Sequence, residues 1–327
     1  MVMAMEKKIS VVIPTYCRPL LLMECLKSLA RQKFARDDFE VIVISDGPDH
    51  LTKQLVVSWK HTGLLDIVYV PLATKRGPAA ARNMGWKLAA GTLVAFTDDD
   101  TLPDPLWLQS IWDAYQQEEL IAYSGRVIVP LPEKPTDYEW NIAQLERARF
   151  ITANCVCTWK ALELIQGFDE RFELAWREDS DLEFKLLQQQ IPIHHLPEAI
   201  VVHPVREASW GVSLREQRKS MFNALLYKKF PGLYRNYIKQ HPIWSYYVMT
   251  LCCLVLLAAL LLNAPAVAFA AVTIWLLLLT GFIWKRLMHT SHAWPHVVEM
   301  IVTSVLIPFL SVYWNLYGAV RFRVLYL

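Results

Sequence analysis

Three consecutive aspartates, Asp98-Asp99-Asp100, follow the short apolar run 93–96. Such a run, bounded by turn residues, predicts a buried strand whose carboxyl end carries the acids. Asp98 and Asp100 are two residues apart, so on an extended backbone their side chains point the same way. Together they could bind one hard divalent cation, Mg²⁺ or Mn²⁺, that also holds a diphosphate. The alternative is an ordinary acidic turn after a strand.

A second chemical signal is the pair Gly77-Pro78, which opens a predicted helix over 78–90 that Gly91 follows. Proline just inside a helix start and glycine just past its end are typical of helix boundaries. The free N–H groups and the dipole of such a helix favour a phosphate near its first turn. Arg76 and Arg82 add cationic donors, although each arginine alone could be a solvated surface charge.

Glu178 and Asp179 form a third candidate site, at or just before a helix predicted over 181–188. Aspartate is among the best helix-capping residues. The local pattern alone therefore favours capping over a functional role.

Alternating strands and helices position these residues. Strands are predicted at 9–13, 39–45, 67–71 and 93–96, and helices at 20–31, 51–60, 78–90 and 181–188. This alternation indicates an α/β fold, with a mainly parallel sheet covered by helices on both faces. Ligands bind at the carboxyl ends of strands in such sheets, and Thr15, Asp46 and Asp98 all lie at such ends. They could converge on one crevice.

The C-terminal part of the chain is far more apolar. Of the 327 residues 54% are hydrophobic, and no charged residue occurs from 242 to 284. Residues 243–262 and 264–284 are each long enough to cross a bilayer, which needs about 20 apolar residues. We expect a helical hairpin there, since two crossings leave the flanking Lys and Arg on the cytoplasmic side. A third apolar segment, 300–320, could be interfacial, re-entrant or spanning, and its Pro308, Asn315 and aromatic residues favour the interface.

Residues 1–239 have the composition of a water-soluble domain, and 240–327 form the predicted membrane domain. The nearly balanced charge of the soluble part gives no electrostatic footprint for nucleic acid. Met1–Ser10 is too short and too charged for a signal peptide, so we expect the soluble domain in the cytoplasm. The six cysteines lack the spacing of a zinc site and are expected to be reduced, with Cys155-x-Cys157 as a metal or redox pair the alternative.

Taken together, these motifs give the chain a family resemblance. They are Val11-Val12-Ile13-Pro14-Thr15-Tyr16, Val41-Ile42-Val43-Ile44-Ser45-Asp46, Arg76-Gly77-Pro78-Ala79-Ala80-Ala81-Arg82-Asn83, Thr97-Asp98-Asp99-Asp100, Thr152-Ala153-Asn154, Gly167-Phe168-Asp169-Glu170 and Glu178-Asp179. Each is weak alone, but their order and spacing over about residues 9–205 resemble the family-2 inverting glycosyltransferases. The resemblance implies a GT-A fold, Rossmann-like, here followed by transmembrane helices.

The resemblance also implies roles for individual residues. Thr15 and Asp46 would hold the nucleobase and ribose of a nucleotide-sugar, and Arg82 would lie near its diphosphate. Asp98 and Asp100 would form the metal-binding DxD motif, with Asp100 the more direct ligand. Asp179 would be the general base and Glu178 would orient it, while Asn154 would line the acceptor side. His203 could approach the diphosphate or metal, or be an ordinary loop histidine.

The implied function is transfer of one sugar from a nucleotide-sugar to a hydroxyl of a lipid-linked saccharide or polysaccharide. It would take place at the cytoplasmic face of the inner membrane, with membrane lipids as partners. Ala175-Trp176-Arg177 replaces a glycine that many relatives have there, so Trp176 is expected to shape a distinct acceptor pocket. The QxxRW motif of processive synthases is absent. Transfer to a polyprenyl phosphate, a nucleotidyltransferase and an inactive scaffold are the alternatives.

Overall fold

The computed structural model describes residues 7–326 and divides the chain into two compact units. The sheet unit comprises residues up to 130 together with 143–205, and the helical unit comprises 131–142 together with 206–327. Segment 131–142 therefore belongs with the C-terminal helices and not with the sheet that flanks it in sequence. The predicted boundary at 239/240 concerns the membrane, which this division does not test. The segment Met1–Ser10 was predicted not to be a signal peptide. Its residues 1–6 lie outside the described residues.

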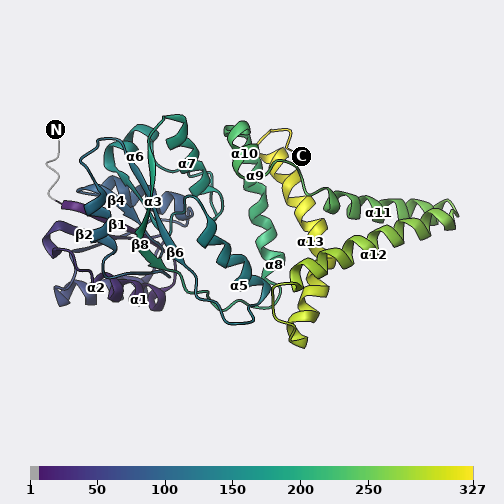
Figure 1. The fold of residues 1–327 in the computed structure, drawn as a ribbon, viewed down its shortest axis with the longest axis horizontal. Helices are drawn as coiled ribbons and strands as arrows, with labels where there is room; N and C mark the ends of the chain where they lie inside the picture. Colours follow the sequence, from purple (N-terminus) through teal and green to yellow (C-terminus); the bar gives the residue numbers. More distant parts are fainter. Residues whose placement is uncertain (1–6, 327) are drawn as a thin grey trace. The chain divides into compact units, whose positions relative to one another are not determined.

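One mixed sheet organises the sheet unit (Figure 1). Its strands, in spatial order, are β3 (Ile67–Pro71), β2 (Phe39–Ser45), β1 (Lys7–Thr15), β4 (Gly91–Phe96), β7 (Cys155–Thr158), β6 (Ala122–Ile128), β8 (Ile193–Val202) and β5 (Leu102–Pro103). The first four are parallel, as predicted, whereas β7 and β5 run antiparallel to their neighbours. The fold is thus the expected α/β class, with a mixed half, in which β6 and β8 are parallel, that the sequence did not indicate.

Helices cover both faces of this sheet because its strand residues alternate between two apolar cores. Val11 and Ile13 belong to one core, whereas Val12 between them belongs to the other. The first core is closed by α1 (Pro19–Leu29), α2 (His50–Thr62) and α4 (Trp107–Ala114). The second is closed by α3 (Pro78–Leu88), α6 (Trp159–Ile165) and α7 (Glu178–Gln188). Cys155 and Cys157 lie inside the second core with no disulfide bond between them.

The helical unit contains short helices and three long apolar ones. The short ones are α5 (Asp137–Ile142), α8 (Val212–Glu216), the 3-10 helix η3 (Gln217–Met221), α9 (Phe222–Lys229) and α10 (Pro231–Tyr237). The long ones are α11 (Trp244–Leu261), α12 (Pro265–Leu287) and α13 (Trp294–Arg321), and each is long and apolar enough to cross a membrane. α11 and α12 form a hairpin that turns at Asn263, where the backbone is left-handed (Figure 1).

Helix α13 differs from the hairpin in its packing. In its most apolar window 39% of the residues are buried, against 17% for α11 and 11% for α12. It meets the hairpin at the open end, where Thr303 and Ser304 accept hydrogen bonds from Arg286 near the end of α12. Farther along, Gly318 packs directly on the backbone of Met221 in η3. α13 therefore lies across the base of the hairpin, between it and the short helices (Figure 1).

Candidate active site

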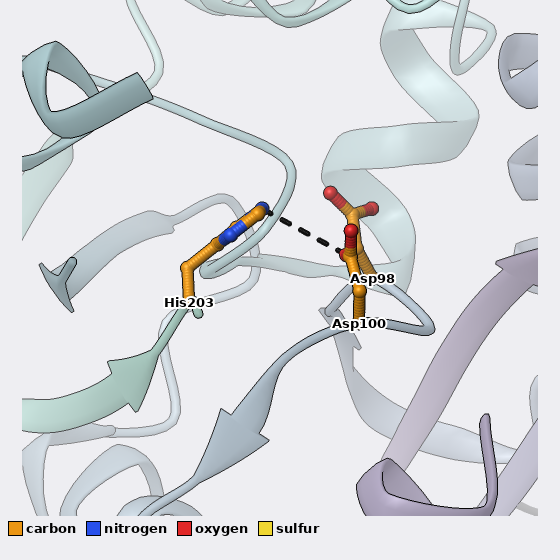
Figure 2. Close-up of side chains that lie close together, drawn as sticks. All are labelled: Asp98, Asp100 and His203. Carbon is orange, nitrogen blue, oxygen red and sulfur yellow. Dashed lines mark ion pairs between the residues drawn. The ribbon is translucent and has the colours of Figure 1, made fainter. Parts of the chain in front are cut away.

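The acidic motif after β4 meets a histidine from β8. Figure 2 shows Asp98, Asp100 and His203 converging, and their nearest ligand atoms all lie within 4.8 Å of one another. Nε2 of His203 is 3.7 Å from Oδ1 of Asp100. The two aspartates belong to the turn that follows β4, and His203 follows the last residue of β8.

This trio fits a divalent cation. Carboxylate oxygens suit Mg²⁺ and Mn²⁺, and an imidazole nitrogen is a further ligand that Mn²⁺ accepts readily. His203 is buried, and its Nδ1 has no hydrogen-bond partner among the described residues. The other ring nitrogen, Nε2, is the one that lies 3.7 Å from Oδ1 of Asp100 and would bind the cation.

The middle aspartate has a different role. Asp99 accepts a hydrogen bond of 2.7 Å from the hydroxyl of Thr15 and lies 3.3 Å from the guanidinium of Arg18. These contacts join the carboxyl end of β1 to that of β4. The hydroxyl of Thr15, predicted to contact a nucleotide, is thus engaged by the protein. Arg18 is a residue of this site that the sequence motifs did not single out.

Asp46, after β2, shapes the turn that precedes α3. Its carboxylate accepts hydrogen bonds from the backbone N–H groups of Arg76, at 2.7 Å, and Gly77, at 2.9 Å. Gly77 has φ of +97°, and a Cβ there would lie 2.4 Å from the carbonyl oxygen of Glu173. Only glycine fits this turn. Asp46 therefore lies at the predicted strand end, with its carboxylate directed to the backbone at the start of α3.

Arg82 connects the two acidic motifs. It is 2% exposed, and its guanidinium donates to Oδ1 of Asp98 at 2.7 Å and to Oε1 of Glu178 at 3.2 Å. Burial alone would lower the pKa of Arg82, but the two carboxylates raise it, so the side chain stays charged. A fixed positive charge inside α3 thus holds the DxD turn beside the first turn of α7.

Glu178 and Asp179 are the first two residues of α7. Arg177 before them has a left-handed backbone, and the N–H of Ser180 donates to Oδ1 of Asp179 at 2.6 Å. Burial raises the pKa of both carboxyl groups above their usual values, and Arg82 opposes the shift at each. Asp179 therefore combines a helix-end hydrogen bond with the raised pKa that is typical of a functional carboxylate.

Asn154, expected on the acceptor side, lies in the protein interior. It is fully buried, and its Oδ1 accepts a hydrogen bond from Nε1 of Trp107. Its Nδ2 donates to the carbonyl oxygens of Arg126 and Ala199. These hydrogen bonds hold the amide within the protein, and the place of Asn154 on the acceptor side stays a prediction.

Trp176 and the motif 167–170 lie around this site. Trp176 is partly exposed, and the guanidinium of Arg177 lies 4.6 Å from its ring centroid. The motif 167–170 is bound to α3 and to the turn before it. The Asn83 side chain both donates to and accepts from the backbone of Phe168, and Arg76 forms an ion pair with Glu170. Of the predicted site residues, the structure brings Arg82, Asp98, Asp100 and Glu178 into one connected group.

Sequence comparison agrees with this geometry. The chain matches the family described as Glycosyl transferase family 2 over residues 10–168, and Glycosyl transferase family group 2 over residues 93–284. It belongs to glycosyltransferase family 2. The matched regions of this family-2 chain include every residue of the site described above.

Curated relatives of this family-2 protein match parts of it. Validoxylamine A glucosyltransferase of Streptomyces hygroscopicus subsp. jinggangensis (strain 5008) is 41% identical over 107 residues, or 33% of this chain and 25% of that one. Chondroitin synthase of Escherichia coli is 26% identical over 290 residues, or 73% of this chain and 42% of that one. The chain thus spans less than half the length of either relative.

Solved structures share the fold over nearly the whole chain. Mannosyltransferase PcManGT of Pyrobaculum calidifontis, in complex with GDP-Man and Mn²⁺, has a TM-score of 0.56 at 19% identity and covers 97% of this chain and 87% of its own. Staphylococcus aureus TarS 1-349 with UDP-GlcNAc has a TM-score of 0.53 at 18% identity, with coverages of 98% and 93%. The mixed-sheet core therefore resembles GT-A glycosyltransferases, as predicted.

Proposed function

We propose that this protein transfers one sugar from a nucleotide-sugar to a hydroxyl group of a saccharide acceptor at a membrane surface. The observation that carries the proposal is the buried Arg82, which links Asp98 of the acidic turn to Glu178 beside Asp179. This link places carboxylates for a metal–diphosphate group beside a carboxylate for proton removal. Family membership supports the same reaction class.

Asp98, Asp100 and His203 are the residues that would hold a divalent cation. When bound there, the cation supplies positive charge against the nucleoside diphosphate that departs. The PcManGT structure contains Mn²⁺ together with GDP-Man, which supports a cation in this fold. Arg82 contributes a second, permanent positive charge beside Asp98.

Asp179 is proposed as the general base. Its carboxylate takes the proton from the acceptor hydroxyl as the oxygen attacks the anomeric carbon on the side opposite the diphosphate. The C–O bond to the diphosphate breaks in the same displacement, so the anomeric configuration inverts. Glu178, held by Arg82, fixes the start of α7 and thereby positions Asp179.

The donor and acceptor classes are also proposals. UDP-GlcNAc and GDP-Man in the structures of similar fold support a nucleotide-sugar donor, with Thr15, Asp46, Arg82 and Asp98 around it. The relative named chondroitin synthase supports a polysaccharide or lipid-linked saccharide as acceptor. The exposed ring of Trp176 near the start of α7 is proposed to contact that acceptor.

The helical unit is proposed to anchor the enzyme in the inner membrane. α11 and α12 would span the bilayer, and the exposed Trp244, Trp284 and Trp294 lie at the end of the hairpin where tryptophans mark a membrane interface. The catalytic residues would then work on the cytoplasmic side.

The reaction class can be tested by product analysis. The purified full chain in detergent is incubated with a panel of nucleotide-sugars, Mg²⁺ or Mn²⁺, and membrane extract as the source of acceptor. A glycosyltransferase releases the nucleoside diphosphate from one donor, whereas a nucleotidyltransferase would release pyrophosphate from a nucleoside triphosphate and a sugar 1-phosphate, which a parallel reaction supplies. Release of pyrophosphate in that reaction, or of no nucleoside diphosphate from any donor, would refute the proposal.

A further inference from the structure

A cavity in the sheet unit lies outside the group of residues described above. It has a volume of about 300 Å³, the lower end of the range of roughly 300–1,000 Å³ that is usual for small-molecule sites. Its walls come from β6, β8 and the 3-10 helix η2 (Ala143–Arg147) with the loop after it. Its lining includes Arg126, Glu146, Ile151, His195 and Pro197.

Two cationic or donor side chains in this cavity are available for a ligand. Arg126 and His195 are both exposed, and neither side chain has a hydrogen-bond or ion-pair partner among residues 7–326. Ser124 pairs with His195 in the sheet, and Arg126 is two residues farther along β6, so both side chains reach the same cavity. A guanidinium is a planar fork of N–H donors that matches a carboxylate or a phosphate.

The rest of the cavity suits a sugar better than a bare anion. The exposed Pro197 supplies apolar surface, against which the C–H face of a sugar ring can pack, and Ile151, which is 5% exposed, lines the cavity behind it. Glu146 supplies a carboxylate that is already positioned, because its Oε1 accepts a hydrogen bond of 2.7 Å from the N–H of Val129. This acceptor suits a sugar hydroxyl and would repel an isolated anion placed beside it.

The floor of the cavity is rigid. At the irregularity between Gly125 and Arg126, the amide of Asn154 donates to the carbonyl oxygens of Arg126 and Ala199. A Cβ on Gly125 would lie 2.4 Å from that amide, so only glycine allows the strands to approach this closely. The buried Asn154 therefore fixes the backbone that carries Arg126, which is the preorganisation that a binding site needs.

The loop of the cavity wall also connects it to the proposed active site. Ile151 lies in the cavity, and two residues later the carbonyl oxygen of Ala153 accepts a hydrogen bond from Thr97, which precedes Asp98. In the same loop Arg149 lies 3.2 Å from Glu183, one turn after Asp179 in α7. A saccharide in this cavity would therefore touch the loop that contacts both acidic motifs.

We infer that this cavity is a subsite for an acceptor saccharide that carries an acidic group, a carboxylate or a phosphate, paired with Arg126 and His195. The inference rests on the proposed glycosyl transfer, because that reaction supplies the reason for a second sugar site.

Ligand binding to the full chain in detergent tests the subsite without any need for turnover. The probes are methyl β-D-glucuronide, glucose 6-phosphate and neutral methyl β-D-glucoside, titrated by ligand-observed NMR. We expect one or both acidic sugars to bind at least about tenfold more tightly than the neutral one, since charge-assisted hydrogen bonds are roughly twice as strong as neutral ones. The sugar that binds identifies the acidic group.

The preference should disappear in Arg126→Gln and weaken in His195→Asn. Arg147→Gln is the matched control. Arg147 is an exposed arginine of η2, the 3-10 helix of the cavity wall, but its own side chain does not line the cavity. Equal binding of all three sugars, no binding of either acidic sugar, or a preference that survives Arg126→Gln would each overturn the subsite. A failure of the proposed function would look different: the wild type would release no nucleoside diphosphate from any nucleotide-sugar.

Discussion

At the residue scale, the site depends on how its charges are shared between partners within the protein. Arg82 forms ion pairs with Asp98 and Glu178. Asp99 accepts a hydrogen bond from Thr15 and forms an ion pair with Arg18. Asp100 faces His203 at 3.7 Å, a distance that leaves room for an ion beside them. Asp100 is therefore the carboxylate on which metal dependence should rest most directly.

Replacing Asp100 tests that dependence. Asp100→Asn keeps the size of the side chain but removes a charged ligand, so we expect nucleoside diphosphate release to fall by at least about 100-fold. Excess EDTA should abolish wild-type turnover, and Mn²⁺ or Mg²⁺ should restore it. Asp104→Asn is the matched control, because this nearby carboxylate accepts a hydrogen bond from the N–H of Leu106 and does not belong to the trio. Full activity in EDTA, or in Asp100→Asn, would contradict the metal site.

The pH profile reports on Asp179. A general base must be ionised, and burial raises the pKa of Asp179 above the ordinary value of 3.8. The turnover rate should therefore be highest at high pH, and it should fall as the pH drops through the raised pKa of Asp179. The rate is measured under saturating donor, with thermal melting at each pH to exclude unfolding. A rate that stays constant down to about pH 4 would exclude an ionisation of this kind.

At the element scale, the sequence predicted the parallel half of the sheet well. β2 and β3 have the predicted bounds, because each apolar run ends at turn residues. β6 and β7 were missed: the four residues of β7 show no alternation, and antiparallel pairing with β4 depends on distant chain segments. The same limit applies to the site. Asp98 and Asp100 were evident from spacing, whereas His203 was named only through the family resemblance, because its approach to them depends on the register of β8.

Segment 131–142 gives another example of long-range pairing that the sequence could not show. Arg286 of α12 donates to both oxygens of Asp137, at 3.2 and 2.8 Å, and also to Thr303 and Ser304 of α13. Both charged residues are buried. The pair joins α5 to the end of α12 and, through Arg286, to the first half of α13, although Asp137 and Arg286 are 149 residues apart.

Breaking this pair should destabilise the helical unit. Asp137→Ala leaves a buried guanidinium without its counter-charge, a loss worth about 3–5 kcal/mol in buried pairs. Thermal melting in detergent should show a large drop for Asp137→Ala and for Arg286→Met, with partial recovery in the double variant. Glu133→Ala, in the same segment but exposed, should melt as the wild type does. If the melting temperature of Asp137→Ala equals that of the wild type, the pair contributes no stability.

At the scale of the whole molecule, the membrane topology depends on α13. This helix is apolar enough to span, but it contacts the hairpin near its base, at Arg286 and around Tyr246 and Tyr247. Its other side packs on η3 and α9, whose surroundings carry Arg218, Lys228 and Lys229. We therefore expect two crossings, with α13 lying along the cytoplasmic interface.

Cysteine labelling in intact cells tests this topology. A cysteine at Asn263, in the hairpin turn, should react with a membrane-impermeant reagent, whereas one added after Leu327 should be protected. Native Cys17, which is exposed on the sheet unit, should be protected as well and serves as the internal control. Labelling after Leu327, with Cys17 still protected, would mean three crossings.

The most direct test of the proposed mechanism is the separation of donor binding from transfer in Asp179→Asn. This variant keeps the shape of the side chain and can still accept the N–H of Ser180, but it cannot take a proton. With the donor identified by the nucleotide-sugar panel, we predict nearly unchanged donor affinity by calorimetry. Transfer of radiolabelled sugar to the membrane fraction should fall by about 10²–10⁴-fold, the usual effect of losing a general base. Normal transfer together with a lower melting temperature would contradict this mechanism and make Asp179 a helix-capping residue only.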